Sequence, residues 1–336
     1  MSRSSHSASQ PAVGSNIAYP PANAALLNTA TLSDGSQSAG LAYHRLSHAD
    51  PSTRWFSPLL EGLLGVAVFI GLNLMISLAL VAAVMGSGLS LQELATNRAV
   101  IMGYPALFAL TFLSLIAIIP SLFVARLVVG PKPWGLIHSV AGRLRASLLL
   151  PYLGLGFVIY GLYYAVILVT SGVSLPEYAY SQPSQVEFWV VILMALVLVP
   201  AQCYAEELAY RGFMMQAIGR WVRTPWLPIL LPAALFMFSH DYDAWGLSFI
   251  FAMGACAGFL CWYTGGLEAS ISLHTANNVT LLMLSMVAGL DPFASAGVGP
   301  VDALQGISLQ LLYVVLACLI FKVRARRGTV SRETQP

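Results

Sequence analysis

The chain has 336 residues, of which 57% are hydrophobic and only 9% are charged. Soluble domains carry about 25% charged residues, so this chain has too little polar surface to solvate a globule of its size. Its formal net charge of +2 is too small, and its charges are too scattered, for a surface that binds nucleic acid. The composition therefore predicts a membrane protein, in which lipid covers part of the apolar surface.

The N-terminal residues 1–57 differ from the rest of the chain. They are rich in Ser, Ala, Asn and Pro and show no apolar periodicity, so they bury too little to repay the entropy of ordering. We interpret them as a disordered cytoplasmic tail in which His6, His44 and His48 are solvated. The tail lacks the pattern of a cleaved secretory signal, so the first apolar span is expected to be a retained anchor.

Apolar segments then recur along residues 58–325, and a helix needs about 20 such residues to cross a hydrocarbon core. They predict an all-α, polytopic membrane protein with about eight transmembrane helices. The expected spans are 62–86, 101–125, 148–170, 188–219, 226–240, 245–263, 267–288 and 304–322. The fifth span is short and contains Pro228 and Pro232, and the topology would change if it were re-entrant. Residues 326–336 are expected to form a C-terminal cytoplasmic tail.

The basic residues between the spans predict the orientation of the chain, because cytoplasmic loops carry an excess of Lys and Arg. The links after the second, fourth and eighth spans are basic, whereas those after the first, third and seventh have little or no positive excess. The basic residues are Arg126, Lys132, Arg143, Arg145, Arg220, Arg223, Lys322, Arg324, Arg326 and Arg327. Eight spans with both termini in the cytoplasm fit every link, and we expect the protein in the plasma membrane. His138 is then expected to be solvated in a cytoplasmic loop.

The four cysteines all lie within predicted spans and show no paired metal-ligand spacing. They are Cys203, Cys256, Cys261 and Cys318. We interpret them as small apolar packing residues and expect no disulfide framework.

Away from the span ends, five charged or titratable residues lie inside the predicted spans, where a charge costs about 2.5–3.5 kcal/mol on insertion scales and therefore indicates function. Glu206, Glu207 and Arg211 are in the fourth span, His240 ends the fifth, and His274 is in the seventh. Glu207 and Arg211 have the i, i+4 spacing and order that favour a helical ion pair. Glu206, about 100° around the helix, is left without a partner. The alternative is that the three residues serve only in packing.

Counting helical rise from the cytoplasmic turns compares the depths of these residues. Glu206 and His240 both lie roughly 20–30 Å from the turn near 220–225, at 1.5 Å per residue. His274 lies only about 12–15 Å beyond the turn at 264–266 by the same rise, so it is expected to be shallower. His274 and Asn278 form a second i, i+4 pair that suits the stabilisation of an oxyanion. The alternative role of these two residues is an interhelical hydrogen-bonded patch. Neighbouring Asn277 competes with Asn278 for either role.

Three short motifs occur in order on these predicted helices: Glu206-Glu207-x-x-x-Arg211, Phe236-x-x-x-His240 and His274-x-x-x-Asn278. Together they resemble the CPBP family, which includes the type II CAAX prenyl endopeptidases and bacterial Abi proteins. The resemblance covers a protease-like core at about residues 188–288.

The resemblance implies an eight-helix intramembrane endopeptidase that cuts near a substrate C-terminus or within a membrane-proximal segment. It implies that Glu206 and His240 activate the attacking water, and that His274 and Asn278 hold the oxyanion. Glu207 and Arg211 would support the site. The residues agree with these roles, because a desolvated carboxylate beside an imidazole can act as a general base.

Two alternative functions use the same residues. In the first, the protease depends on zinc held by two histidines and two glutamates, although the H-E-x-x-H signature of zincins is absent. In the second, the protein is a non-enzymatic transporter or immunity scaffold whose buried charges line an ion path or brace a partner. We expect no cofactor, no metal and no nucleic-acid partner. The expected partners are the lipid bilayer and a membrane-associated protein or peptide substrate.

Overall fold

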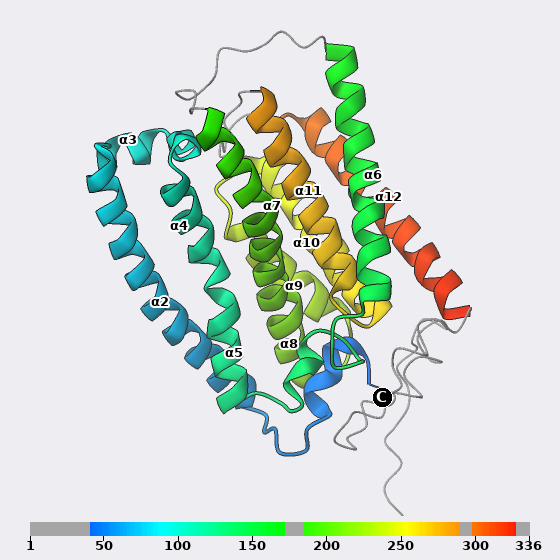
Figure 1. Ribbon diagram of the computed structural model, residues 1–336. Coiled ribbons are helices and arrows are strands. Elements are labelled where there is room, and N and C mark those ends of the chain that lie inside the picture. The colour runs from blue at the N-terminus through cyan, green and yellow to red at the C-terminus, as the bar shows by residue number, and fades with distance from the viewer. Residues whose placement is uncertain (1–40, 172–184, 289–297, 327–336) are drawn as a thin grey trace, which may run out of the picture.

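The computed structural model of the protein describes residues 41–171, 185–288 and 298–326, and all the regular elements in these ranges are helical. Figure 1 shows the longer helices running side by side as one bundle. The predicted all-α class is therefore confirmed.

The helices begin and end close to the predicted apolar segments. The longer ones are α2 (Ser57–Ser87), α4 (Pro105–Ile116), α5 (Ile118–Val128), α6 (Ala146–Ser171), α7 (Gln185–Glu207), α9 (Trp226–Phe238), α10 (Ala244–Thr264), α11 (Glu268–Ala288) and α12 (Pro300–Arg326). The shorter ones are α3 (Leu91–Thr96), α8 (Met215–Trp221), the 3-10 helices η1 (Tyr43–His48), η2 (Arg98–Gly103) and η3 (Trp134–Ile137), and the π-helix η4 (Leu208–Met214).

The expected count of eight spans is not confirmed. Within the described residues, six helical stretches are long and apolar enough to cross a membrane: 57–87, 105–128, 146–170, 186–221, 244–264 and 300–326. α9 has only 13 residues, and α11 carries polar side chains that lower the hydropathy of its described part. Both helices are nevertheless present in the bundle, where α11 packs against α6, α7, α10 and α12.

Apolar side chains occupy both the interior and the outside of the bundle. The interior of α6, α10, α11 and α12 contains fully buried rings such as Tyr152, Tyr313 and Phe321. α2 instead exposes large side chains along its length, including Leu63 and Leu78. An apolar exterior of this kind is expected for helices that face lipid.

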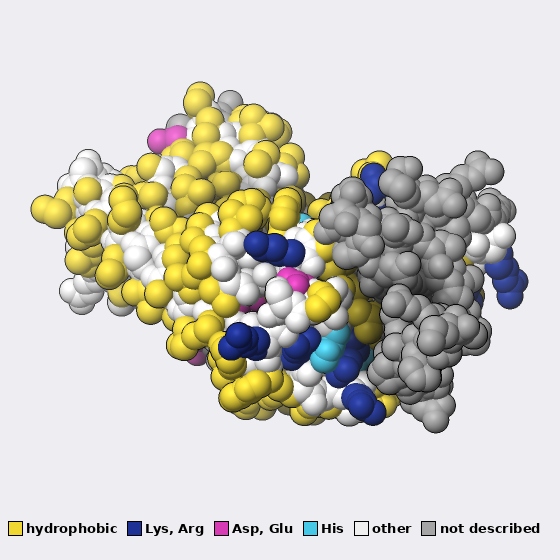
Figure 2. All heavy atoms as spheres, turned by 90° about the horizontal axis from the view of Figure 1, so that it is seen from below, with side chains coloured by type: hydrophobic (Ala, Val, Ile, Leu, Met, Phe, Trp, Pro, Cys, Tyr) yellow, Lys and Arg dark blue, Asp and Glu magenta, His cyan; other side chains and the backbone are white. Residues whose placement is uncertain are grey.

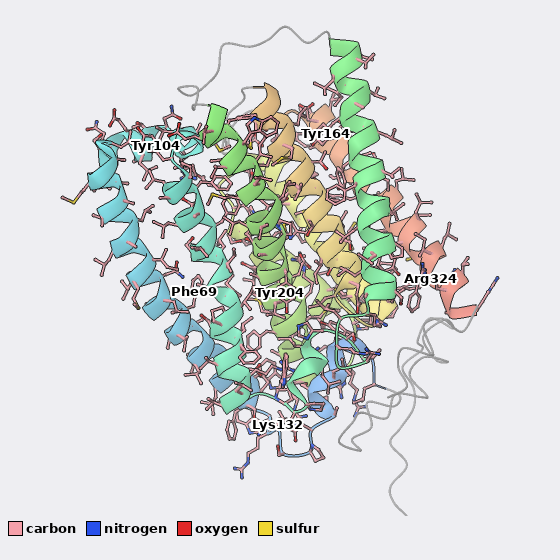
Figure 3. All side chains as sticks on the ribbon, viewed as in Figure 1. Phe69, Tyr104, Lys132, Tyr164, Tyr204 and Arg324 are labelled. Atoms are coloured by element: carbon pink, nitrogen blue, oxygen red, sulfur yellow. The ribbon has the colours of Figure 1, made fainter. Side chains whose placement is uncertain are left out.

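One end of the bundle is basic. Figure 3 places Lys132 at the lower end of the bundle, Arg324 near the lower end of α12, and Tyr104 at the upper end of the bundle. Figure 2 views the molecule from below and shows Lys and Arg side chains gathered there. We call this lower end the basic end. Its exposed basic residues include Arg54, Lys132, Arg143 and Arg223.

The turn between α10 and α11 is buried, although it lies toward the basic end. The segment before α6 covers it: Leu267 N–H donates to the His138 carbonyl at 2.8 Å, and Val140 N–H donates to the Gly265 carbonyl at 2.9 Å. Gly265 has a φ of +72°, in the left-handed region that glycine adopts at the end of a helix. The turn is therefore held inside the protein rather than at its aqueous surface.

The prediction that residues 41–57 belong to a disordered tail is wrong. Tyr43, His44 and Leu46 are buried, and α2 already begins at Ser57. Apolar and hydrogen-bonding contacts with α8 repay the entropy of ordering this segment, which carries too little periodicity to be recognised in the sequence. The predicted tails at 1–40, with His6, and at 327–336 lie outside the described residues.

Three charged or titratable residues expected in solvated loops are buried instead. Arg126 pairs with Glu61 at 3.1 Å. Arg145 Nη2 contacts Glu268 Oε2 at 2.7 Å. His138 shares a hydrogen bond with Tyr204 Oη at 2.6 Å. Counting residues in loops could not show this, because each of these partners lies far away in the chain.

Candidate active site

The two adjacent glutamates lie where α7 changes its helical type. Glu207 is the last residue of α7, and the following seven residues, which include Arg211, form the π-helix. π-turns are rare and often occur at functional sites. Tyr204, two residues before Glu206, lies in the lower half of the bundle in Figure 3, so the acids are nearer to the basic end than to the opposite end.

Glu207 is buried and contacts a basic side chain on each of two elements. Its Oε1 accepts a hydrogen bond from Arg211 Nη1 at 2.9 Å, as the i, i+4 spacing predicted. The same oxygen accepts from His274 Nδ1 at 3.0 Å. The Arg211 guanidinium also lies over the Phe236 ring, with 4.5 Å between Cζ and the ring centroid, a favourable cation–π arrangement. Glu207 therefore ties the π-helix to α11.

Glu206 is almost as buried, with 8% of its surface exposed, but it has no comparable partner. Its Oε2 lies 3.6 Å from His274 Nε2, which is too long for a hydrogen bond. Among the described residues this oxygen has no hydrogen-bond partner. An unpaired carboxylate oxygen in apolar surroundings is costly, so it marks a position where a polar reactant can be held.

His274 lies between the two glutamates, and the expectation that it is shallower is wrong. The helical count assumed that the 264–266 turn is at the membrane surface, whereas this turn is buried beneath the segment before α6. His274 is consequently deeper than its distance from the turn indicates. Its Nε2 also lies 3.2 Å from Asn278 Nδ2, so the predicted i, i+4 pair is in contact.

His240 follows the short helix α9 and is partly buried. Its Nδ1–H donates to the Phe236 carbonyl at 2.8 Å, which leaves Nε2 as the acceptor nitrogen of the neutral ring. The centroid of the Phe236 ring lies 4.7 Å from that of His240 and 5.7 Å from that of His274. Phe236 therefore packs against both imidazoles, and the structure brings His240, His274 and the glutamates into one region.

Three further polar residues of this region were not singled out as site residues. Cys203, one turn before Glu207, is buried near His274. Ser270, one turn before His274 on α11, is buried near Glu207. Asn277 Nδ2 donates to Asn278 Oδ1 at 2.9 Å, so the two amide side chains contact each other. The i, i+4 spacing of Ser270 and His274 is the signal that could have identified Ser270.

No three His, Cys, Asp or Glu side chains within the described ranges are arranged so that they could hold a metal ion. His274 and the two glutamates converge, but their side chains are not arranged to hold a metal ion either. The zinc-dependent alternative is tested below by chelation.

Comparison with known proteins adds an independent observation. Residues 186–280 match the family model described as type II CAAX prenyl endopeptidase Rce1-like. The matched segment contains all six predicted site residues, from Glu206 to Asn278. The predicted resemblance is therefore confirmed for this part of the chain, which is related to the CAAX proteases.

The chain is also similar to a curated protein from Bacillus subtilis (strain 168), the uncharacterized protein YyaK. The two are 32% identical over 141 residues, which is 38% of this chain. The chain spans 46% of the length of YyaK. No solved structure matches the chain at a significant level.

Proposed function

We propose that the protein is an intramembrane endopeptidase that acts on a membrane-associated substrate, such as a CAAX-like protein. It hydrolyses a peptide bond near the C-terminus of this substrate or in a membrane-proximal segment. The observation that carries this proposal is the buried Glu206 carboxylate, whose free oxygen faces a histidine that is already held by Glu207. The match of residues 186–280 to CAAX endopeptidases supports the same reaction class.

In the proposed reaction, Glu206 and His240 activate water. Glu206 takes a proton as the water oxygen attacks the scissile carbonyl carbon, and the free Nε2 of His240 accepts a hydrogen bond from the same water. The proton then passes to the leaving amine as the C–N bond breaks. The hydrogen bond from His240 Nδ1 to the Phe236 carbonyl supports this role because it keeps Nε2 available.

His274 and Asn278 are suited to hold the oxyanion of the tetrahedral intermediate. Nε2 of His274 and Nδ2 of Asn278 are 3.2 Å apart, so one oxygen atom can accept a hydrogen bond from both. In the structure Asn278 Nδ2 donates to His274 Nε2. In the proposed role the oxyanion replaces Nε2 as the acceptor for Asn278, and His274 carries both ring protons, one donated to Glu207 and one directed at the oxyanion. Glu207 and Arg211 hold His274 in place.

We propose that the basic end faces the cytoplasm, because positively charged segments are retained on that side. Arg54, Lys132, Arg143 and Arg223 are exposed there. α12 also ends there, at Arg326, so the described ends of the chain lie on the same side. The plasma membrane is the proposed location.

The test is replacement of Glu206 in the full chain. Loss of a general base lowers the rate by about 10²–10⁴-fold, so Glu206→Gln and Glu206→Ala should lose cleavage while the protein remains inserted and folded. Glu187→Gln, a change of the same type at the start of α7, should retain activity. Substrates that accumulate with Glu206→Gln in the native membrane identify the reaction once their termini are mapped. Full activity in a well-folded Glu206→Ala protein would contradict the proposal.

A further inference from the structure

The segment that precedes α2 binds the end of α8. We define residues 41–56 as the N-terminal strap; it contains η1 and lies beside α8 at the basic end (Figure 1). Strap side chains donate to backbone carbonyls of α8 and of the residues just beyond its end, at distances of 2.9 to 3.4 Å. Ser47 donates to Gln216, Arg45 to Gly219 and Val222, His48 to Arg220, and His44 to Arg223. The last carbonyls of a helix have no partner within it, so the contacts to Gly219 and Arg220 supply partners that the end of α8 lacks.

The contacts also run in the opposite direction. Arg220 donates to the Ser47 carbonyl at 3.3 Å and to His48 Nδ1 at 3.0 Å. Trp221 Nε1 donates to the Trp55 carbonyl at 2.8 Å. The two backbones approach so closely that a Cβ atom at Gly219 would lie 1.7 Å from the His44 carbonyl oxygen. Only glycine at this position permits the observed docking.

α8 is continuous with the π-helix that carries Arg211. A π-turn contains one residue more per turn than an α-turn, so its relaxation to α-helix would rotate the residues on one side by about 100° relative to the other. Such an arrangement persists only where neighbouring structure enforces it. Gln216 supplies part of this restraint, because its Nε2 donates to the Leu136 carbonyl at 2.8 Å and its Oε1 accepts from Arg126 at 3.1 Å.

We infer that the N-terminal strap is a positioning element for the proposed active site. By fixing the rotation of α8, the strap keeps the π-helix in place and holds Arg211 against Glu207, which in turn holds His274. The strap touches neither substrate nor water in this role. The inference rests on the proposed function where it concerns catalysis, whereas the coupling between the strap and the π-helix can be measured without activity.

The experiment replaces Gly219 with alanine in the full chain and measures hydrogen exchange of the backbone amides by mass spectrometry. Alanine favours a helix over glycine, so intrinsic propensity predicts unchanged or slower exchange. Displacement of the strap predicts the opposite: at least tenfold faster exchange in residues 43–56 and 208–221. The matched control is Gly161→Ala in α6, where an added Cβ meets no atom within 4 Å. It should leave exchange in both segments unchanged.

Activity provides the second readout. Gly219→Ala should lower kcat at least tenfold with a smaller change in KM, because the site is misaligned while most substrate contacts remain. Arg45→Met, which leaves Gly219 intact, should act in the same direction, and Arg45→Lys should restore part of the loss. The inference would be overturned if the strap is displaced but residues 208–221 exchange normally and kcat is unchanged. It would also be overturned if the strap stays docked in Gly219→Ala. If Gly219→Ala speeds exchange in both segments but the wild-type protein cleaves no substrate, the coupling is supported and the proposed function is overturned.

Discussion

At the scale of single residues, Glu207 differs from a simple ion-paired acid. One of its oxygens accepts from both Arg211 and His274, and the other has no hydrogen-bond partner among the described residues. The charge of Glu207 is thus shared between an arginine on the π-helix and a histidine on α11. Loss of Arg211 would leave this buried carboxylate with the imidazole alone.

Glu207 and Arg211 are expected to stabilise the folded protein only as a pair. Arg211→Leu or Glu207→Leu alone should lower the free energy of unfolding by about 3–5 kcal/mol, because each leaves an uncompensated buried charge. The double variant should recover much of the loss, so the effects should be strongly non-additive. Reversible unfolding in detergent or bilayers measures all three variants. A double variant as unstable as the sum of the two single variants would show that the residues do not stabilise each other.

Sequence reasoning predicted the Glu207–Arg211 ion pair and the His274–Asn278 contact, because both depend on helical spacing within one segment. It failed where two segments meet. The contacts of His274 with both glutamates depend on a buried turn, and the proximity of Cys203 and Ser270 to these residues depends on the packing of α7 against α11. The catalytic roles remain predictions.

At the scale of elements, the N-terminal strap should dock less firmly at low pH. Burial lowers the pKa of His44 to about 4, and it lowers the pKa of His48 to about 4 with help from Arg45 and Arg220. Undocked histidines would titrate near 6.5. Between pH 6.5 and 4 the undocked strap binds more protons, so docking weakens as the pH falls through this range and is independent of these groups above it.

This pH dependence can be measured by hydrogen exchange in residues 43–56. The charged groups around the two histidines are Arg45, Arg220 and Asp50, and Asp50 accepts from Lys132 N–H at 2.8 Å. A variant with His44→Gln and His48→Gln should dock with a flatter pH profile. An unchanged profile in that variant would assign the effect to other groups.

Elements whose identity depends on distant contacts were the hardest to predict. The strap has little apolar periodicity, and the π-helix uses residues that would suit an α-helix equally well. α9 was expected as a span ending at residue 240, but its helix ends at Phe238 with 13 residues. By contrast, the boundaries of α6, α10 and α12 follow long apolar runs and were predicted within a few residues.

At the scale of the whole molecule, the remaining prediction separates water activated by protein side chains from zinc-dependent hydrolysis. If Glu206 and His240 activate water directly, cleavage should persist after exhaustive treatment with a zinc chelator. Elemental analysis of the purified active protein should then show far less than one metal ion per chain. Stoichiometric zinc that restores a chelator-inactivated enzyme would reassign the histidines as ligands.

Composition predicted the membrane class and the helical fold, since both follow from the length and apolarity of the segments. The number of spans did not follow in the same way. A short helix and a helix with polar side chains can both lie inside a bundle, where other helices rather than lipid surround them. Apolarity alone does not distinguish such helices from spans that face lipid.

The polar character of α11 has a consequence for biosynthesis. The first half of this helix contains Glu268, His274, Asn277 and Asn278, and a newly made segment with these residues would partition poorly into lipid on its own. It is expected to enter as a hairpin with α10 and to find Arg145 and Glu207 only when the surrounding helices close. The glutamate–histidine cluster, which joins α7 to α11, therefore forms only after both helices are in place.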